Sequence, residues 1–250
     1  APSLQPAEFV MMANGLLDAG YLVVATDYEG LGTPGRHPYI VGESEARGVL
    51  DIVRVAQTFP NANASKRFVV WGHSQGGHAA MATHKMLESG AFPDIQITAS
   101  SPMSGAYDLT GVQATTMFRE YDRPHYLPYL LLSFDYGYDI WQGDIYEVFN
   151  PPFNVDMKKY FAQPRTIDYG YLDSVLPRVP NKMIIDSLVV LFKTDTNFIF
   201  TRKLRENNLY NWTPKAPVQL CACYGDNEVM YQNSEVAYNY MHPKAPHVRK

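Results

Sequence analysis

The sequence predicts an α/β fold: a mostly parallel β-sheet with helices on both faces and an inserted helical cap. Strand-like and helix-like segments alternate along the first 107 residues, which is the order that builds a parallel sheet. An aromatic-rich stretch without a strand period follows, and the alternation resumes near residue 218. A chain of 250 residues is long enough for one large domain with an insertion.

The predicted strands are continuous apolar runs, as expected where both faces of a sheet are covered. The predicted helices carry apolar residues at three- and four-residue spacing. The expected order is helix 8–18, strand 21–26, helix 43–59, strand 67–72, helix 75–89 and strand 95–99, followed after the insertion by strand 218–224, helix 234–242 and the first residues of a strand at 247–250.

A change in composition divides the chain into three parts. Residues 108–213 hold ten of the 18 tyrosines and eight of the 12 phenylalanines, with scattered prolines and no clear strand period. We therefore expect residues 1–107 to form the first part of an α/β core and residues 108–213 a mostly helical cap. Residues 214–250 would complete the core.

Composition excludes several classes of protein. The net charge of -4, the isoelectric point near 6.0 and the lack of a Lys/Arg cluster argue against a nucleic-acid partner. The longest apolar runs, at 127–134 and 183–192, are shorter than the ~20 residues that a transmembrane helix needs. No His, Glu or Asp grouping has the spacing of a metal site, and we predict no metal.

A glycine-rich segment near the N-terminus matches a dinucleotide fingerprint by its letters alone. Gly30-x-Gly32-x-x-Gly35 follows an apolar run, but Pro34 and Pro38 interrupt what comes next. Helical periodicity starts only near residue 43, whereas the fingerprint needs a helix N-terminus to hold the pyrophosphate. We therefore predict no cofactor.

The segment 69–78 carries the strongest chemical signal. It contains Gly72-x-Ser74-x-Gly76 between an apolar strand and an Ala-rich helix, the context in which this motif forms a nucleophile elbow. Ser74 would sit on a strained turn, where a Cβ at position 72 or 76 would collide with neighbouring backbone. The following helix offers the Gln75 N–H to an oxyanion. The alternative is a glycine-rich turn that contains a serine by chance. The strand before the motif and the helix after it favour an α/β-hydrolase instead.

A serine nucleophile needs a base that is oriented by an acid. In an α/β-hydrolase the acid follows the serine in the chain, just past a late strand. Asp226 lies at the end of the predicted strand 218–224, and Glu228 is the weaker candidate. A turn-forming aspartate after Gly225 is the alternative interpretation.

The histidine base is not where the fold requires it. Only two of the seven histidines, His242 and His247, follow Asp226 in the chain. His242 is predicted to end a helix and His247 to begin a strand, whereas the base belongs on the loop after that strand. Both are weak candidates, and we expect the catalytic histidine to be absent from these residues.

Five segments of the chain carry a family resemblance when they are taken together. They are Ala1-Pro2-Ser3-Leu4, Ala25-Thr26-Asp27-Tyr28-Glu29-Gly30-Leu31-Gly32, His37-Pro38-Tyr39, Gly42-Glu43-Ser44-Glu45-Ala46-Arg47 and Gly72-His73-Ser74-Gln75-Gly76-Gly77. With these segments the chain resembles the secretory lipase family of α/β-hydrolases. The resemblance covers residues 1–107, is thin through the insertion, and returns at 224–234.

The resemblance implies hydrolysis of carboxylic esters with Ser74 as nucleophile and Asp226 as acid. It also implies a cap at 108–213 over an acyl-binding pocket, and a secreted or periplasmic protein. Family members carry strands before the Ala-Pro-Ser motif and a histidine beyond the last strand. We therefore expect the chain to be incomplete at both ends.

The predicted function is cleavage of a small-molecule or lipid ester through an acyl-enzyme on Ser74, with a transient contact between the cap and a lipid interface. Two alternatives stay open. A serine peptidase of the prolyl oligopeptidase type shares the elbow and the placement of the acid, but the aromatic insertion shows no charged subsite for a peptide terminus. A catalytically silent binding module would keep the fold and lack the base.

Overall fold

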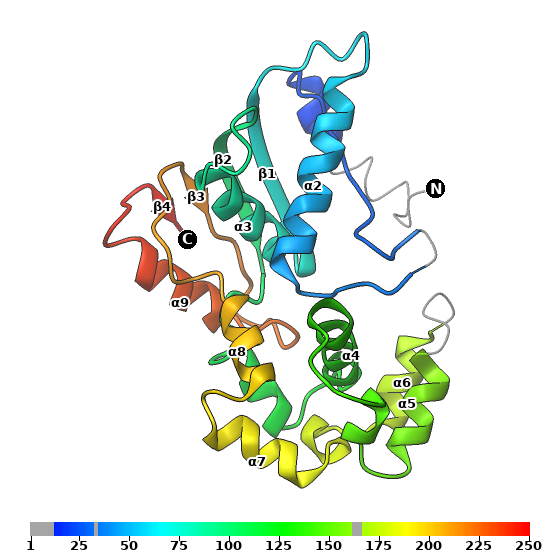
Figure 1. Ribbon diagram of the computed structural model, residues 1–250. Helices are drawn as coiled ribbons and strands as arrows, with labels where there is room; N and C mark the ends of the chain where they lie inside the picture. The colour runs from blue at the N-terminus through cyan, green and yellow to red at the C-terminus, as the bar shows by residue number, and fades with distance from the viewer. Residues whose placement is uncertain (1–12, 33–34, 162–166) are drawn as a thin grey trace.

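Among the residues that the structure describes, the sheet has four parallel strands that follow one another in chain order. The computed structural model describes residues 13–32, 35–161 and 167–250. Every pairing is parallel, with Val70 opposite Ser100, Ser100 opposite Val218 and Val218 opposite Val248. The strands are β1 (Arg67–His73), β2 (Gln96–Met103), β3 (Val218–Gln219) and β4 (Val248–Arg249), in the order β1-β2-β3-β4 (Figure 1).

Three helices flank this sheet: α2 (Gly42–Gln57), α3 (Gln75–Glu88) and α9 (Gln232–Met241). The α3 helix packs against β1 and β2, the α2 helix packs on α3, and α9 lies beside β4. Leu50 of α2 and Leu87 of α3 share one apolar cluster with the strand residues Phe68 and Ile97. These elements confirm the predicted parallel sheet with helices around it.

Two predicted strands differ from the structure. Residues 21–26 run without regular secondary structure and pair with no strand in the described part of the chain. With no paired strand beside them, Tyr21 and Leu22 stay 53% and 49% exposed. The strand expected at 218–224 pairs as a strand over two residues only, adds a bridge from Cys221 to Met103, and then leaves the sheet. Of the predicted helix 8–18, residues 13–18 are helical and the rest lies outside the described residues.

The chain between β2 and β3 forms a helical layer beneath the sheet in Figure 1. Its α-helices and short 3-10 helices are η1 (Gln113–Phe118), α4 (Tyr126–Tyr138), η2 (Ile145–Val148), α5 (Phe153–Phe161), α6 (Tyr169–Val175), η4 (Pro180–Met183), α7 (Asp186–Thr194) and α8 (Ile199–Glu206). The layer has its own core, which includes the fully buried Phe134, Met157 and Leu172. The division into core and cap at 108 and 213 stays a prediction.

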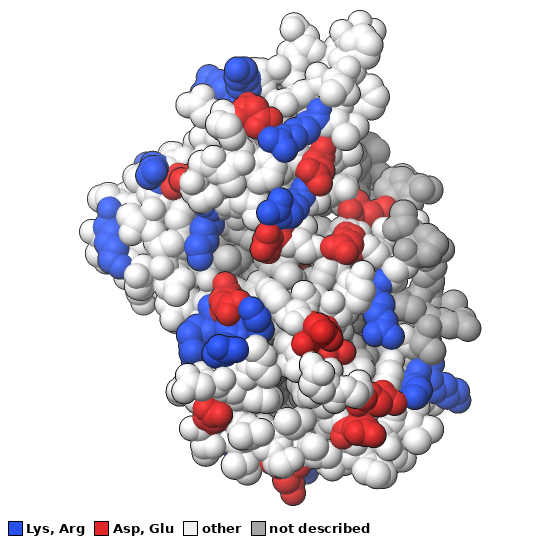
Figure 2. Space-filling model, viewed as in Figure 1, with Lys and Arg blue, Asp and Glu red and all other residues white. Residues whose placement is uncertain are grey.

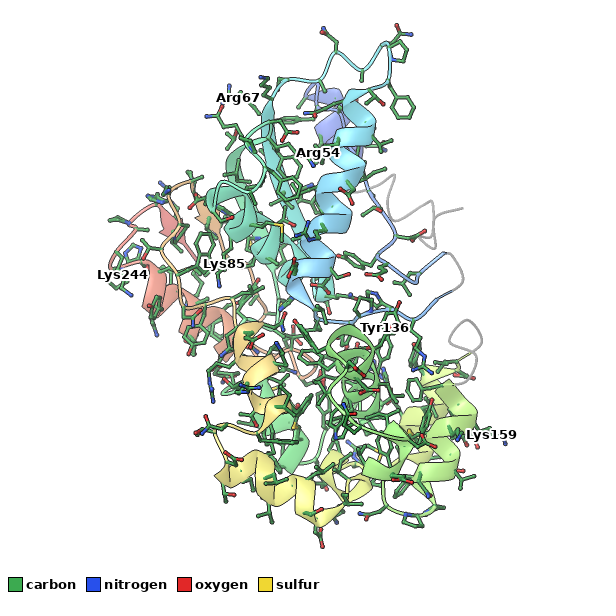
Figure 3. All side chains as sticks on the ribbon, in the orientation of Figure 1. Arg54, Arg67, Lys85, Tyr136, Lys159 and Lys244 are labelled. Atoms are coloured by element: carbon green, nitrogen blue, oxygen red, sulfur yellow. The ribbon has the colours of Figure 1, made fainter. Side chains whose placement is uncertain are left out.

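Side chains crowd the interior of this layer, whereas Tyr136 on α4 and Lys159 on α5 lie exposed on its surface (Figure 3). Acidic and basic side chains are interspersed over the face drawn in Figure 2, in keeping with a net charge of -4. In the described ranges, no helix is long and apolar enough to span a membrane.

Leu50 tests the packing of α2 on α3. Its side chain is fully buried, so Leu50→Ala should lower the free energy of unfolding by about 2–5 kcal/mol through lost apolar contact and a residual cavity. Val55→Ala in the same helix is the control, because Val55 is 51% exposed and should change stability by about 0.5 kcal/mol or less. Urea unfolding measures both. Equal effects would contradict the proposed core.

Candidate active site

Ser74 forms a strained turn between β1 and α3. Its φ of 57° and ψ of -118° lie in a region that residues with a Cβ rarely adopt. The Ser74 N–H donates to the Met103 carbonyl at 2.9 Å, and the Ser74 carbonyl accepts from the N–H groups of Gly77 at 2.9 Å and His78 at 3.2 Å. These bonds on both sides hold the turn in place, which is the geometry of a nucleophile elbow.

Glycines let the backbone close tightly around this turn. A Cβ on Gly72 would lie 2.3 Å from the Gly76 carbonyl oxygen, as the motif led us to expect. A Cβ on Gly76 would meet nothing nearer than the Tyr28 hydroxyl at 3.8 Å, so the steric reason expected for that glycine does not hold. The second tight position is Gly77, where a Cβ would lie 2.3 Å from the Met103 carbonyl oxygen.

Gln75, the residue after Ser74, forms a hydrogen bond with a buried carboxylate. Glu45 of α2 is 1% exposed. Its Oε1 accepts from Gln75 Nε2 at 2.8 Å and from the Ile40 N–H at 3.2 Å, and its Oε2 lies 2.7 Å from His78 Nδ1. Three donors thus satisfy a charge that would otherwise be costly to bury. The carboxylate joins the loop before α2 to the first turns of α3.

His37 extends this network toward the N-terminal loop. Its Nε2 lies 2.6 Å from Gln75 Nε2, and its Nδ1 lies 2.9 Å from the Glu29 carbonyl oxygen. Burial lowers the pKa of His37 below its ordinary value and outweighs the hydrogen bond to Glu29, which raises it. A neutral ring that donates from Nδ1 and accepts at Nε2 fits both partners. The Gln75 side chain is therefore held from two directions.

Ser74 lies on a cavity of about 580 Å³ between the two layers. The elbow contributes His73, Ser74 and Gln75, and the loop before α2 contributes Tyr39. The helical layer and the turn after β3 supply the rest of the wall, which consists of Arg123, His125, Tyr126, Tyr129, Tyr169, Gly170, Asp173 and Glu228.

Part of this wall is charged. Arg123 Nε lies 2.8 Å from Glu228 Oε1, and Arg123 Nη1 lies 3.5 Å from Asp173 Oδ2. His125 Nδ1 lies 2.5 Å from the other oxygen of Asp173. The sequence shows no charged subsite for a peptide terminus in the aromatic insertion, and the structure adds that Arg123, His125 and Asp173 of this insertion are paired charged or polar groups on the cavity wall. The contacting residues in this wall are 48 and 105 positions apart in the sequence, so no local motif predicts the wall.

Two smaller apolar cavities lie in the helical layer, and one of them shares lining residues with the Ser74 cavity. One, of about 60 Å³, shares Tyr39 and Tyr126 with the Ser74 cavity and is lined further by Leu109, Met117 and Leu127. The other, of about 40 Å³, shares Met117 and Leu127 with it and reaches aromatic residues of α7 and α8. Apolar space therefore extends from the Ser74 cavity into the helical layer.

Asp226 lies in the turn after β3. Its Oδ1 accepts from the N–H groups of Glu228 and Val229, both at 3.0 Å, and its Oδ2 makes no hydrogen bond among the described residues. Asp226 does not line the Ser74 cavity, whereas Glu228 does. The carboxylate of Glu228 is engaged by Arg123. The structure shows no hydrogen bond between Ser74 and either carboxylate among the residues it describes.

The two weak histidine candidates are bonded elsewhere. His242 Nδ1 lies 2.9 Å from the Val248 carbonyl oxygen, and its ring stacks on Tyr238. His247 Nε2 lies 3.0 Å from the Pro214 carbonyl oxygen. Neither ring lines the Ser74 cavity. Both histidines hold the β4 end of the sheet together.

The glycine loop that matches a dinucleotide fingerprint does not open a helix. Gly30 and Gly32 take positive φ values of 75° and 72°, and α2 starts only at Gly42. Pro34 lies outside the described residues. Within the described ranges, no group of three or more His, Cys, Asp and Glu side chains could hold a metal ion.

A serine on a strained strand–helix turn, at the carboxyl end of a strand in a parallel sheet, defines an α/β-hydrolase. A sequence model of the secretory lipase family matches residues 4–120, a range that contains the elbow. This match confirms the resemblance predicted from the sequence. No curated protein matches the chain.

Solved structures show the same fold. LipA, a rice cell wall degrading esterase from Xanthomonas oryzae, is 25% identical with a TM-score of 0.81, over 97% of this chain and 68% of LipA. A putative hydrolase from Legionella pneumophila is 25% identical with a TM-score of 0.87, over 99% and 68% of the two chains. Candida antarctica lipase A in its closed state is 17% identical with a TM-score of 0.72, over 95% and 54%.

The α/β-hydrolase fold is thereby confirmed, and the family match together with the LipA likeness supports an ester hydrolase. This chain spans about two thirds of the length of LipA.

Gly72 offers a test of the elbow. Gly72→Ala places a Cβ against the Gly76 carbonyl, so we expect a loss of about 2 kcal/mol or more in unfolding free energy, within the range known for overpacking. Gly48→Ala is the matched control: position 48 is inside α2 with nothing within 4 Å of the added Cβ. That change should stabilise the protein by about 0.5–1 kcal/mol. Thermal unfolding measures both, and similar shifts would contradict the close approach at Gly72.

Proposed function

We propose that the protein hydrolyses carboxylic esters through an acyl-enzyme on Ser74. The observation that carries this proposal is the position of Ser74, on a strained turn at the end of β1 and on the wall of the 580 Å³ cavity. The secretory lipase match and the esterase activity named for LipA support the same reaction class. The substrate would be a small-molecule or lipid ester.

In the proposed reaction the Ser74 hydroxyl attacks the ester carbonyl carbon. A histidine held by an acid takes the hydroxyl proton and passes it to the leaving alcohol as the carbon–oxygen bond breaks. The Gln75 N–H and the positive end of α3 stabilise the tetrahedral oxyanion. Water then attacks the acyl-enzyme, releases the carboxylic acid and restores Ser74.

Asp226 is the acid in this proposal. Its Oδ1 is fixed by two backbone N–H groups, which leaves Oδ2 to accept from the Nδ1–H of an imidazole. Glu228 suits this task less well, because Arg123 already engages its carboxylate. His242 and His247 are hydrogen-bonded to the Val248 and Pro214 carbonyls, so neither serves as the base in the proposed reaction.

The helical layer serves as the cap in this proposal. Its apolar cavities, with walls from Met117 and Leu127, would take the acyl chain. Apolar side chains on its outer helices, such as Val155 and Val190 at 67% and 56% exposure, support a transient contact with a lipid interface. The secretory lipase match suggests a secreted protein, and a periplasmic location is the alternative that the sequence left open.

A fluorophosphonate probe tests the nucleophile. We expect it to label one residue, and Ser74→Ala to abolish labelling. Among the serines that the structure describes, Ser74 alone combines a positive φ with the start of a helix, because Ser104, with a φ of 45°, precedes no helix directly. Ser174→Ala on α6 is the control and should label as the unmodified protein does. Peptide mass mapping locates the label. Label on another serine would overturn the assignment of Ser74.

Esters of graded chain length test the cap. Each methylene buried in the apolar cavities adds about 0.8 kcal/mol of binding, so kcat/KM on p-nitrophenyl esters should rise about fourfold per methylene until the space is full. Leu127 lines both apolar cavities, so Leu127→Trp should fill part of their space. We expect kcat/KM to fall about tenfold on the octanoate and less than twofold on the acetate. Leu191→Trp, at a position that is 39% exposed, is the control.

The same assay separates the alternatives. A dipeptide anilide cleaved in preference to every ester would favour the peptidase. Ester binding without turnover, together with an unlabelled Ser74, would favour the binding module. Equal losses on acetate and octanoate in Leu127→Trp would contradict an acyl site in the helical layer.

A further inference from the structure

A histidine–aspartate pair lies in the wall of the Ser74 cavity, and the proposed reaction does not use it. His125 directly precedes α4, and Asp173 lies on α6. One oxygen of Asp173 lies 2.5 Å from His125 Nδ1 and accepts from the His125 backbone N–H at 3.4 Å. The two side chains are only 7% and 10% exposed. Two elements of the helical layer thus fix the imidazole on the cavity wall.

One edge of this imidazole is left for a ligand. The ring lies between Tyr126 and Tyr169, with centroid distances of 4.4 and 4.7 Å. Its Nδ1 edge is engaged by Asp173. His125 Nε2 makes no hydrogen bond with any residue in the described ranges, although His125 lines the cavity. Nε2 is therefore the polar ring atom that remains to bind a substrate.

The protonation state decides what Nε2 can bind. Burial lowers the pKa of His125 below its ordinary value, although the hydrogen bond and the charge of Asp173 raise it. Arg123 lowers this pKa further and Glu228 raises it, both by smaller amounts. At neutral pH the ring is neutral, and its one N–H is donated to Asp173. Nε2 then carries a lone pair, so its partner must be a donor such as a hydroxyl.

The neighbouring charges narrow the choice of ligand. Arg123 bridges Glu228 and Asp173, so this wall holds one positive and two negative charges. An anionic group would meet net negative charge. A hydrocarbon would remove water from these groups without replacing its hydrogen bonds, which costs free energy. A neutral group that bears hydroxyls avoids both penalties.

The apolar cavities beyond Tyr39 and Tyr126 suit the acyl chain, which leaves the charged wall to the alcohol part of the ester. We propose that His125, held by Asp173, recognises a free hydroxyl group on the alcohol moiety, so that the favoured substrates are partial esters of a polyol. This inference rests on the proposed function and names its substrate class.

Binding to the Ser74→Ala variant tests the inference without turnover. Three ligands share one acyl group: 1-monobutyrin carries two free hydroxyls, its di-O-methyl ether carries none, and propyl butyrate lacks both oxygens. We expect 1-monobutyrin to bind about 3- to 10-fold more tightly than the other two, which is the size of one neutral hydrogen bond. Ligand-observed NMR titration measures the three dissociation constants.

Substitution of His125 is the second part of this binding experiment. His125→Phe in the Ser74→Ala background keeps a ring between Tyr126 and Tyr169 and removes Nε2, so the advantage of 1-monobutyrin should disappear. His242→Phe is the matched control, because that ring stacks on Tyr238 and does not line the cavity. If His125→Phe fails to fold, the imidazole ¹⁵N resonances of Ser74→Ala serve instead. The His125 Nε2 resonance should move with 1-monobutyrin and stay in place with the ether.

Equal dissociation constants for the three ligands, or an advantage that survives His125→Phe, would overturn the inference. Failure of the hydroxyl-site inference is distinguishable from failure of the proposed function. A labelled Ser74 with equal dissociation constants would reject the hydroxyl site alone. An unlabelled Ser74 with the hydroxyl preference intact would reject the ester hydrolase alone.

Discussion

Ser74 holds a backbone conformation that costs on the order of 1–3 kcal/mol, and the surrounding packing offsets this cost. The Met103 carbonyl at the end of β2 accepts the Ser74 N–H, so the neighbouring strand fixes the turn. Gly72 and Gly77 let the backbone of β1, α3 and β2 approach more closely than any Cβ would allow. The position of the Ser74 side chain therefore depends on β1, β2 and α3 meeting at this turn.

The buried Glu45 carboxylate extends this arrangement into the helical layer. His78, which it engages through Nδ1, lies 3.3 Å through Nε2 from the Asn207 carbonyl oxygen at the end of α8. The Asn207 side chain accepts from the Gly42 N–H at 2.8 Å and donates to the Tyr138 hydroxyl at 2.7 Å. One polar network thus joins α2, α3, α4 and α8. Movement of the helical layer would shift the Gln75 side chain, because the Glu45 carboxylate of this network also binds that side chain.

Features that arise from neighbouring residues could be predicted from the sequence. The elbow needs a strand, a short glycine turn and a helix in direct succession, and all three are visible between residues 67 and 89. The strand expected at 21–26 could not be judged in this way, since an apolar run does not show whether a partner strand lies beside it. The end of β3 at Gln219 has the same cause, because pairing with β2 and β4 decides where that strand stops.

The site itself was only partly predictable, for the same reason. Ser74 and Gln75 follow from a local motif, whereas the pairs His125–Asp173 and Arg123–Glu228 join residues 48 and 105 positions apart. His125 precedes Asp226 in the chain, so the residue order of an α/β-hydrolase does not suggest it as the base, and no local motif suggests another role for it. A signal was present in the density of tyrosines around positions 121–129, but aromatic density alone does not distinguish an apolar cap from a wall with charges in it.

The α4 helix explains why the cavity has two chemically different sides. Leu127 and Leu130, in its first turns, face the apolar cavity of about 60 Å³. Arg123 and His125 lie just before the helix, where the positive end of the helix dipole favours a negative partner. Asp173 occupies that position and accepts the His125 N–H. The helix end that stabilises the carboxylate thus also orients the imidazole, and within a few residues the wall changes from polar to hydrocarbon. An ester held across this boundary would keep a fixed direction relative to Ser74.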